Sequence, residues 1–241
     1  MFGREDITEM VGKKNKPRWS LAMLGLSMIA LQAQAQDDPQ YRMEIGAGVG
    51  LVSYEGDFNG NVFGNVQPMA SVIGRYNFDP YKDLRLSASF GKLRGDSKAV
   101  KTYYPDYVDN PYSFSNTLVD VSLVFEYNFW PYGTGRDYRG AKCLTPYIYG
   151  GLGATSVSGS KSVFTANVPI GIGVKYKVGE RLNVGLDWGI HFSLSDELDG
   201  VKDPYGVKSS GAFKNTDCYS MLQLSLTYSF KAKCRTCNKE E

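Results

Sequence analysis

The chain has no apolar run that could cross a bilayer as a helix. The run from Leu21 to Leu31 is shorter than the roughly 20 residues that such a helix needs. The slightly negative mean hydropathy also argues against a helical membrane protein. A net charge of +2 and the lack of a sustained basic face give no indication of nucleic-acid binding. Histidine is nearly absent, with one residue in 241.

The first 35 residues are predicted to be a secretory signal peptide. A basic segment precedes the apolar run, and Ala33-Gln34-Ala35 supplies a small-x-small cleavage site. We expect cleavage between Ala35 and Gln36. A start at Met10 would give a signal of ordinary length, so residues 1–9 are interpreted as a start-site artefact. No cysteine follows the cleavage site, which argues against a lipoprotein anchor.

Glycine and aromatic residues are abundant. The 27 glycines, 17 tyrosines and 12 phenylalanines suit a β protein with many turns. The length of the mature chain is enough for one domain. A β-barrel would hide its apolar character at every second position, so low overall hydropathy does not argue against it.

A short pattern of tyrosine, spacer and apolar residue closes a stretch of alternating hydrophobicity four times, about every 50 residues. The four copies are Tyr76-Asn77-Phe78, Tyr127-Asn128-Phe129, Tyr176-Lys177-Val178 and Tyr228-Ser229-Phe230. One such period fits a long hairpin with its connections, so four periods predict eight strands. Aromatic residues that end every second strand are what the interfacial girdle of a membrane barrel requires.

The alternating segments give the positions of these strands. They lie at about 42–52, 67–78, 84–91, 119–129, 146–156, 168–178, 182–192 and 222–230. Their length suits tilted strands that cross the hydrocarbon. The predicted fold class is therefore all-β: an eight-stranded antiparallel transmembrane up-and-down barrel over residues 36–230, of OmpA-like size, followed by a basic tail at 231–241.

The connections predict an orientation. Two tight turns, 79–83 and 179–181, follow the tyrosine marks, whereas the connections on the other side are longer and polar, at about 53–66, 95–116, 157–165 and 194–216. Short turns are periplasmic in outer-membrane barrels, so both termini are expected in the periplasm. The long connection 131–145 breaks this rule on the short-turn side.

The inward positions of the strands carry charges of both signs. The expected interior charges are Arg42, Glu44, Arg75, Arg85, Asp120, Glu126, Lys175 and Asp187. Buried charges must be paired, and an eight-stranded barrel is just wide enough for its own side chains. We therefore expect a salt-bridged plug rather than a pore, with a proton or ion path as the alternative.

The cysteines are candidates for disulfides in an oxidising compartment. Cys143, Cys234 and Cys237 fall on the predicted periplasmic side, while Cys218 lies near the outer end of the last strand. A structural or intermolecular disulfide that involves the tail is expected. Redox or metal chemistry at Cys234-Arg-Thr-Cys237 is the alternative. No metal, cofactor or small-molecule substrate is expected.

One short motif suggests an enzyme. His191-Phe192-Ser193 resembles the His-x-Ser of outer-membrane lipid A deacylases, which are also small barrels. Those enzymes need the pair on the lipid-facing surface, whereas the alternation places Phe192 there and His191 inside. The protein is therefore expected not to be an enzyme, and lipid A modification is a minor alternative.

The mature chain resembles a Bacteroidota family of small outer-membrane barrels that includes PorG of the type IX secretion system. The resemblance rests on Tyr41-x-Met43-Glu44-Ile45-Gly46-x-Gly48-x-Gly50, Ser53-Tyr54-x-Gly56-Asp57, Arg75-Tyr76-Asn77-Phe78-x-Pro80, Gly91-Lys92-Leu93-x-Gly95-Asp96 and Asp217-x-Tyr219. The basic tail with its cysteines also fits.

This resemblance implies a non-enzymatic component that contacts the periplasmic ring proteins of the secretion system as well as outer-membrane lipid. The residues that would face such a partner are Arg136, Arg139, Lys142, Lys231, Lys233 and Arg235. A solvated basic edge near lipid headgroups explains the same residues without a partner. The alternative function is an autonomous outer-membrane barrel, either an adhesin or an envelope-stabilising protein.

Overall fold

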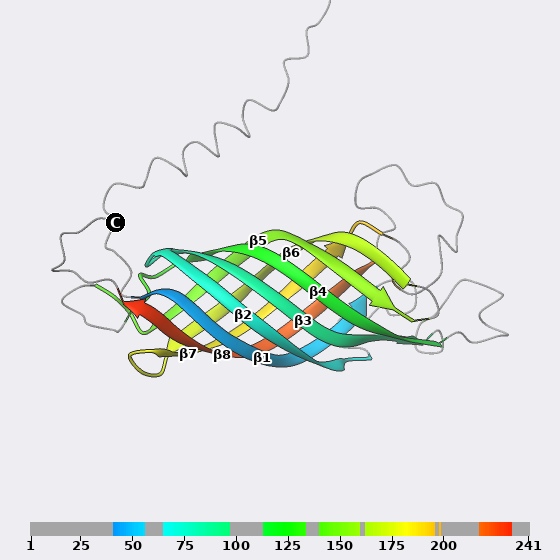
Figure 1. Ribbon diagram of the computed structural model, residues 1–241, viewed down its shortest axis with the longest axis horizontal. Coiled ribbons are helices and arrows are strands. Elements are labelled where there is room, and N and C mark those ends of the chain that lie inside the picture. Colours follow the sequence, from blue (N-terminus) through cyan, green and yellow to red (C-terminus); the bar gives the residue numbers. More distant parts are fainter. Residues whose placement is uncertain are drawn as a thin grey trace, which may run out of the picture. The chain divides into compact units, whose positions relative to one another are not determined.

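The protein forms a closed antiparallel β-barrel in the computed structural model (Figure 1). The structure describes residues 41–55, 65–96, 113–133, 140–159, 162–195, 198 and 217–232. Its strands are β1 (Tyr41–Glu55), β2 (Gln67–Asp79), β3 (Lys82–Asp96), β4 (Ser113–Asn128), β5 (Leu144–Ser158), β6 (Ser162–Lys177), β7 (Leu182–Ser193) and β8 (Cys218–Ala232). Each strand pairs with its neighbours in sequence, and β8 closes the barrel on β1. The predicted fold class is confirmed.

The alternation in the sequence sets which side chains point into the barrel. In β4, Val121, Leu123 and Phe125 are 43–48% exposed, whereas Asp120 and Ser122 between them are buried. Successive side chains of a strand point to opposite faces, so this segment can only place its apolar residues outside or inside as a set. The register with β3 and β5 places them outside, as expected for a barrel that presents apolar residues to its surroundings.

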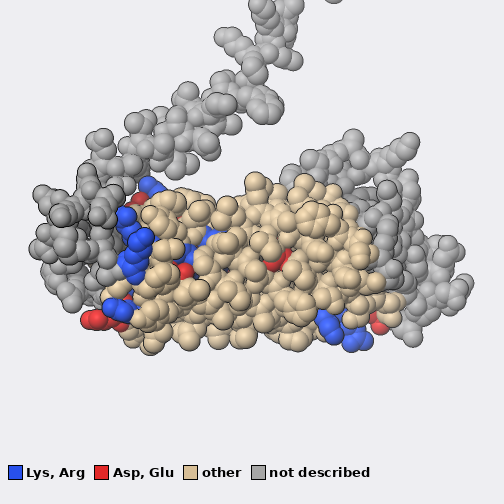
Figure 2. All heavy atoms as spheres, in the orientation of Figure 1, with Lys and Arg blue, Asp and Glu red and all other residues tan. Residues whose placement is uncertain are grey.

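An apolar belt surrounds the barrel wall. On β4 it reaches from Val119 to Phe129, which at about 3.4 Å per residue and a tilt near 40° corresponds to about 25 Å along the barrel axis. Beyond Val119 the outward residues of this strand are Thr117, Ser115 and Ser113. Figure 2 shows that most of the visible wall between the two ends carries neither Lys, Arg, Asp nor Glu.

An aromatic girdle marks one edge of this belt. Its exposed members, 36–50% accessible, are Tyr76, Phe78, Tyr127, Phe129, Tyr176, Tyr228 and Phe230. Tyr76 contacts Phe78, and Tyr127 contacts Phe129, with ring centroids 5.1 and 5.9 Å apart. We call this edge the girdle end; β1 begins and β8 ends there, because Tyr41 pairs with Ala232.

The strands at the opposite end are longer than the sequence predicted. The expected loop 157–165 is mostly strand, because Val157 pairs with Val163 and Ser158 with Ser162. Residues 113–116 likewise belong to β4 rather than to the expected loop 95–116. The outward positions there are serines except for Phe164, and serines resemble loop residues, while Val157 and Val163 are buried inside.

Among the described residues, no helix is long and apolar enough to cross a membrane. The predicted signal peptide, with its cleavage site at Ala35 and Gln36, lies outside the described residues and stays a prediction. The same holds for the division of the chain into signal peptide, barrel and tail.

Candidate functional site

Glu126 lies at the centre of a buried ionic network inside the barrel. Its carboxylate contacts Arg75 (Nε to Oε2, 2.9 Å), Arg85 (Nε to Oε1, 3.0 Å) and Lys175 (Nζ to Oε2, 2.5 Å). The four residues project from β4, β2, β3 and β6. One carboxylate therefore connects four of the eight strands.

Each of these cations also contacts a second carboxylate. The pairs are Arg75 with Glu44 at 2.6 Å, Lys175 with Asp83 at 2.6 Å, and Arg85 with Asp187 at 3.3 Å. Every side chain in the network is at most 5% exposed. Removing charges from water costs several kcal/mol per ion unless they are paired and hydrogen-bonded. Their mutual pairing offsets the cost of burying these charges. The paired side chains fill the girdle half of the barrel.

The structure places most of the predicted interior charges in the barrel. Glu44, Arg75, Arg85, Glu126, Lys175 and Asp187 form the network, and Asp120 is buried farther from the girdle end. Arg42 differs: it is half-buried at the start of β1 and has no part in the network. Water reaches side chains at the barrel end, so a charge there needs no buried partner.

Asp83 is a network residue that the sequence analysis missed. It was assigned to the turn 79–83, but it is the second residue of β3 and only 3% exposed. Its spacing of two residues from the inward Arg85 could have indicated that Asp83 also points inward, because residues i and i+2 share one face of a strand.

Two tyrosines line the network on one side. The ammonium of Lys175 lies 4.5 Å from the ring centre of Tyr147, and the guanidinium of Arg85 lies 4.7 Å from that of Tyr149. Facing glycines leave space for these rings, because a Cβ at Gly189 would overlap Tyr149 Oη. The glycine-rich inward faces of β6 and β7 therefore serve to accommodate bulky side chains.

A second polar cluster surrounds Asp120. Its Oδ2 accepts hydrogen bonds from Tyr219 Oη at 2.8 Å, Asn167 Nδ2 at 2.6 Å and Thr155 Oγ1 at 3.2 Å. The imidazole of His191 stacks on Tyr219 with ring centres 4.8 Å apart, and its Nδ1 lies 3.7 Å from Asp120 Oδ2. This cluster joins β4, β5, β6, β7 and β8 across the lumen.

The His-x-Ser motif belongs to this interior. His191 is 5% exposed and Ser193 is fully buried, while Phe192 between them takes the other face of β7. Neither His191 nor Ser193 faces the outer side of the barrel wall. The arrangement therefore lacks the surface placement on which the comparison with deacylases depended.

An apolar cluster fills the barrel toward the end opposite the girdle. Its members are Val52, Tyr54, Met69, Leu93, Phe114, Leu118, Val157, Leu198, Tyr219 and Met221. Leu198 lies within the cluster: its N–H donates to Asp217 Oδ2 at 2.9 Å, and its carbonyl accepts from Asn116 at 3.0 Å. Sequence analysis missed this plug because most of these positions continue the inward register beyond the predicted strand ends, and Leu198 lies in a connection.

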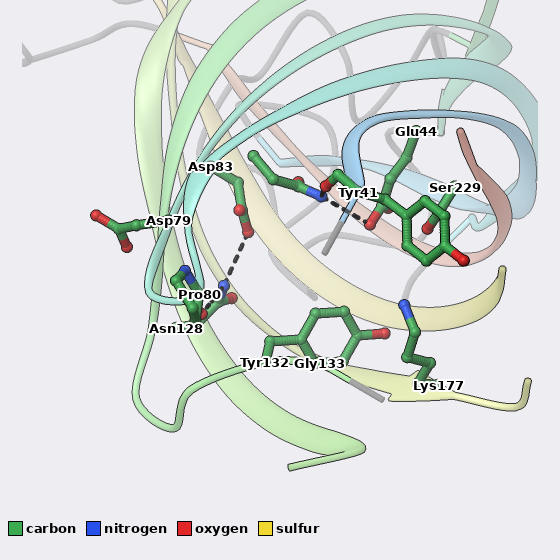
Figure 3. A pocket seen from close by; sticks show the side chains of 11 residues that line it. Tyr41, Glu44, Asp79, Pro80, Asp83, Asn128, Tyr132, Gly133, Lys177 and Ser229 are labelled. Carbon is green, nitrogen blue, oxygen red and sulfur yellow. Dashed lines mark hydrogen bonds between the residues drawn. The ribbon is translucent and has the colours of Figure 1, made fainter. Parts of the chain in front are cut away.

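The girdle end holds a cup lined by aromatic and charged residues (Figure 3). Its volume is about 320 Å³, counting the part open to solvent. Lys177 Nζ lies 5.4 Å from the ring centre of Tyr132 and 5.7 Å from that of Tyr41. Tyr132 Oη and Lys177 Nζ both donate to Asn183 Oδ1, at 3.0 and 3.1 Å. Burial in the barrel mouth, with Glu44 nearby, raises the pKa of Tyr132 well above its usual range.

Tyr132 comes from the β4–β5 connection, which the sequence marked as unusually long. The two arms of this connection pair, since Gly133 N donates to Lys142 O at 3.1 Å and Lys142 N to Pro131 O at 2.7 Å. Tyr132 N also donates to Pro80 O at 3.0 Å. The arms of this connection are therefore fixed to the barrel end.

Two of the six residues expected to face a partner are described. Lys142 lies 4.8 Å above the ring of Trp130, and Lys231 is exposed at the end of β8. The other four are outside the described residues: Arg136, Arg139, Lys233 and Arg235.

A disulfide at the candidate Cys143 has no support among the described residues. Cys143 and Cys218 are both free thiols, and no disulfide is present among the described residues. Cys234 and Cys237 lie outside them. The structural or intermolecular disulfide expected in the tail therefore stays a prediction.

Comparison with known proteins identifies a family and a group of similar folds. A model of the family described as Domain of unknown function (DUF6089) matches residues 21–239. No curated protein matches the sequence.

Solved structures of small outer-membrane barrels are similar in fold. Neisserial surface protein A is 12% identical, with a TM-score of 0.48, over 78% of this chain and 97% of that one. The outer membrane protein OprG from Pseudomonas aeruginosa is 13% identical, with a TM-score of 0.48, over 81% of this chain and 98% of that one. A major outer membrane protein from Thermus thermophilus is 14% identical, with a TM-score of 0.46, over 78% of this chain and 99% of that one. These likenesses concern the fold alone.

Proposed function

The chain belongs to the DUF6089 family, and we propose that it is a non-enzymatic outer-membrane barrel and a structural component of a protein secretion machine. The observation that carries this proposal is the distribution of polarity in a closed barrel. The outer wall is an apolar belt with an aromatic girdle, and the lumen holds the ionic network. A barrel with no free edges satisfies its backbone hydrogen bonds internally, which a bilayer demands.

The filled lumen favours a structural role over that of a channel. The ionic network, the Asp120 cluster and the apolar plug occupy successive levels of the barrel. A solute would have to break buried ion pairs to pass, and breaking one by removing a partner costs about 3–5 kcal/mol. This argues against the proton or ion path that the interior charges left open.

In this proposal the secretion machine is the type IX secretion system. The support is the family resemblance of the strand motifs around Tyr41, Arg75 and Gly91. In this proposal the girdle end is periplasmic, because two of its three connections, β2–β3 and β6–β7, are short, whereas only β5–β6 is short among the four at the opposite end. The β4–β5 connection and the tail after β8 would then contact the periplasmic ring proteins of the system.

Secretion of type IX cargo from a deletion strain tests this proposal. The strain is complemented with the full-length gene, with a gene that ends at Phe230, or with one whose residues 134–139 are replaced by a glycine-serine linker. The matched control replaces residues 97–112, on the opposite side, by a linker of the same composition. Barrel insertion is checked for each by heat-modifiable mobility in outer-membrane fractions.

We expect the full-length gene and the 97–112 control to restore secretion, and the two girdle-end variants to insert but fail. Normal secretion in the deletion strain would exclude a part in the system. Failure of the 97–112 control alone would move the docking surface to the opposite end, whereas normal secretion in the deletion strain would favour the alternative, an autonomous adhesin or envelope-stabilising barrel. That alternative has one observation in its favour: β3 and β4 extend beyond the belt with the exposed residues Lys92, Arg94 and Ser115.

A further inference from the structure

Cations gather around Tyr41 at the girdle end, where β7, β8 and β1 meet. The guanidinium of Arg181 and the ammonium of Lys177 each lie 5.7 Å from the ring centre of Tyr41. Arg42 lies opposite Lys231 across the β1–β8 seam, between the register pairs Tyr41 with Ala232 and Met43 with Phe230. Two cations therefore lie beside one aromatic ring, and two more, Arg42 and Lys231, belong to the adjoining strand ends.

Arg181 is held in place although it is exposed. Its Nη1 donates to Tyr228 Oη at 2.9 Å, and its carbonyl accepts from Ser229 N at 2.7 Å. The guanidinium is thus held by hydrogen bonds to two tyrosines, Tyr228 and Tyr41, and remains exposed. A pre-oriented guanidinium is suited to bidentate binding of a phosphate group. Glu180, the exposed carboxylate next to it in sequence, is the neighbouring acid.

Exposed apolar residues border Arg181 on one side. Tyr228 belongs to the aromatic girdle and pairs in register with Leu182 and Ile45, which are 44% and 55% exposed. Leu226, the next outward residue of β8, is 55% exposed. A ligand that places a phosphate on Arg181 can therefore lay an alkyl chain along these residues. A phospholipid has both of these groups.

We propose that Arg181, with Lys231 and Tyr228, binds the phosphate of a membrane phospholipid at the girdle end, with the acyl chains against Leu182, Leu226 and Ile45. At this level of a bilayer, basic side chains attract lipid phosphates and aromatic residues anchor the protein at the interface. Lys231 is exposed one residue after the girdle residue Phe230, and it has a left-handed backbone (φ 60°). This inference rests on the proposal that the barrel spans a membrane.

Native mass spectrometry of the full chain, refolded in detergent, tests the site. The probe is phosphatidylglycerol, and the comparison lipid is a diacylglycerol with the same chains and no phosphate. The variants are R181Q/K231Q and Tyr228→Phe, which removes the hydroxyl that holds Arg181. The control is K92Q/R94Q, which removes two exposed cations at the opposite end. Folding is checked by heat-modifiable mobility, and insertion by flotation with vesicles.

We expect the wild type to retain phosphatidylglycerol and not the diacylglycerol. The R181Q/K231Q variant should bind it about tenfold more weakly, because it loses the charged hydrogen bonds to the phosphate. Tyr228→Phe should be weakened less, and the control should be unchanged. Equal binding by R181Q/K231Q and wild type, or equal weakening in the control, would overturn the site.

Two competitors separate the lipid from other anions. If inorganic phosphate or a poly-glutamate peptide displaces phosphatidylglycerol from the wild type at comparable concentration, the site takes a soluble anion or an acidic protein and the lipid assignment is wrong. A barrel that folds but does not float with vesicles would contradict the membrane proposal itself. A barrel that inserts but shows no lipid preference would contradict only this inference.

Discussion

At the scale of single residues, Glu126 is the position on which the interior depends most. It is fully buried and contacts three cations, each of which has only one further carboxylate in the network. Breaking a buried ion pair on one side leaves an uncompensated charge, whereas exposed pairs contribute little. The stability of the girdle half should therefore be far more sensitive to this carboxylate than to any surface acid.

Replacing Glu126 by glutamine should destabilise the barrel by about 3–5 kcal/mol, because Arg75, Arg85 and Lys175 then share too few negative charges. Urea unfolding of the protein in lipid vesicles, followed by tryptophan fluorescence and heat-modifiable mobility, measures the loss. Glu180→Gln, which removes an exposed carboxylate, is the matched control and should unfold like the wild type. An unchanged midpoint for Glu126→Gln would show that the network does not determine stability.

At the scale of elements, the β1–β8 seam closes the barrel and brings two backbones unusually close. A Cβ at Gly46 would overlap the carbonyl oxygen of Leu226 and lie 2.7 Å from Thr227 Cα. Backbone atoms cannot rotate away as side-chain tips do. Gly46 is therefore required by close approach rather than by its dihedral freedom.

The Gly46→Ala variant should impair barrel closure, because β8 must shift to admit the methyl group. We expect a reduced folded fraction in the mobility assay and faster proteolysis of the vesicle-bound protein. Gly74→Ala serves as the control, since a Cβ at Gly74 meets nothing within 4 Å. If both alanine variants fold equally well, the seam adjusts more freely than its geometry indicates.

The strands also show what could be predicted from the sequence and what could not. Alternation predicted all eight strands and the inward positions of Arg75 and Glu126, because a strand has only two faces. It failed at strand ends, where Val157 and Val163 lie inside a hairpin whose outer face is mostly serine. It also could not foresee Tyr132 in the barrel mouth, because that contact depends on how a connection folds back rather than on a periodic pattern.

At the scale of the whole molecule, the belt determines where a charge can be tolerated. Leu123 is 48% exposed and lies among the outward apolar residues of β4, whereas Ser115 on the same face of the same strand lies beyond them. The two positions share a strand and a direction, and they differ in their distance from the girdle. They therefore separate the cost of a charge in hydrocarbon from the effect of a substitution on the strand.

Leu123→Arg should weaken folding into lipid vesicles by about 2–4 kcal/mol, the cost of a cation near the middle of a bilayer in such barrels. Ser115→Arg should change it by at most about 1 kcal/mol, because its side chain reaches the interface. Urea titration of folding into vesicles measures both. In detergent micelles without a fixed thickness the two variants should differ less. Equal, small effects in vesicles would mean that the apolar wall is covered by protein rather than by lipid, which would contradict the membrane span on which the proposed function depends.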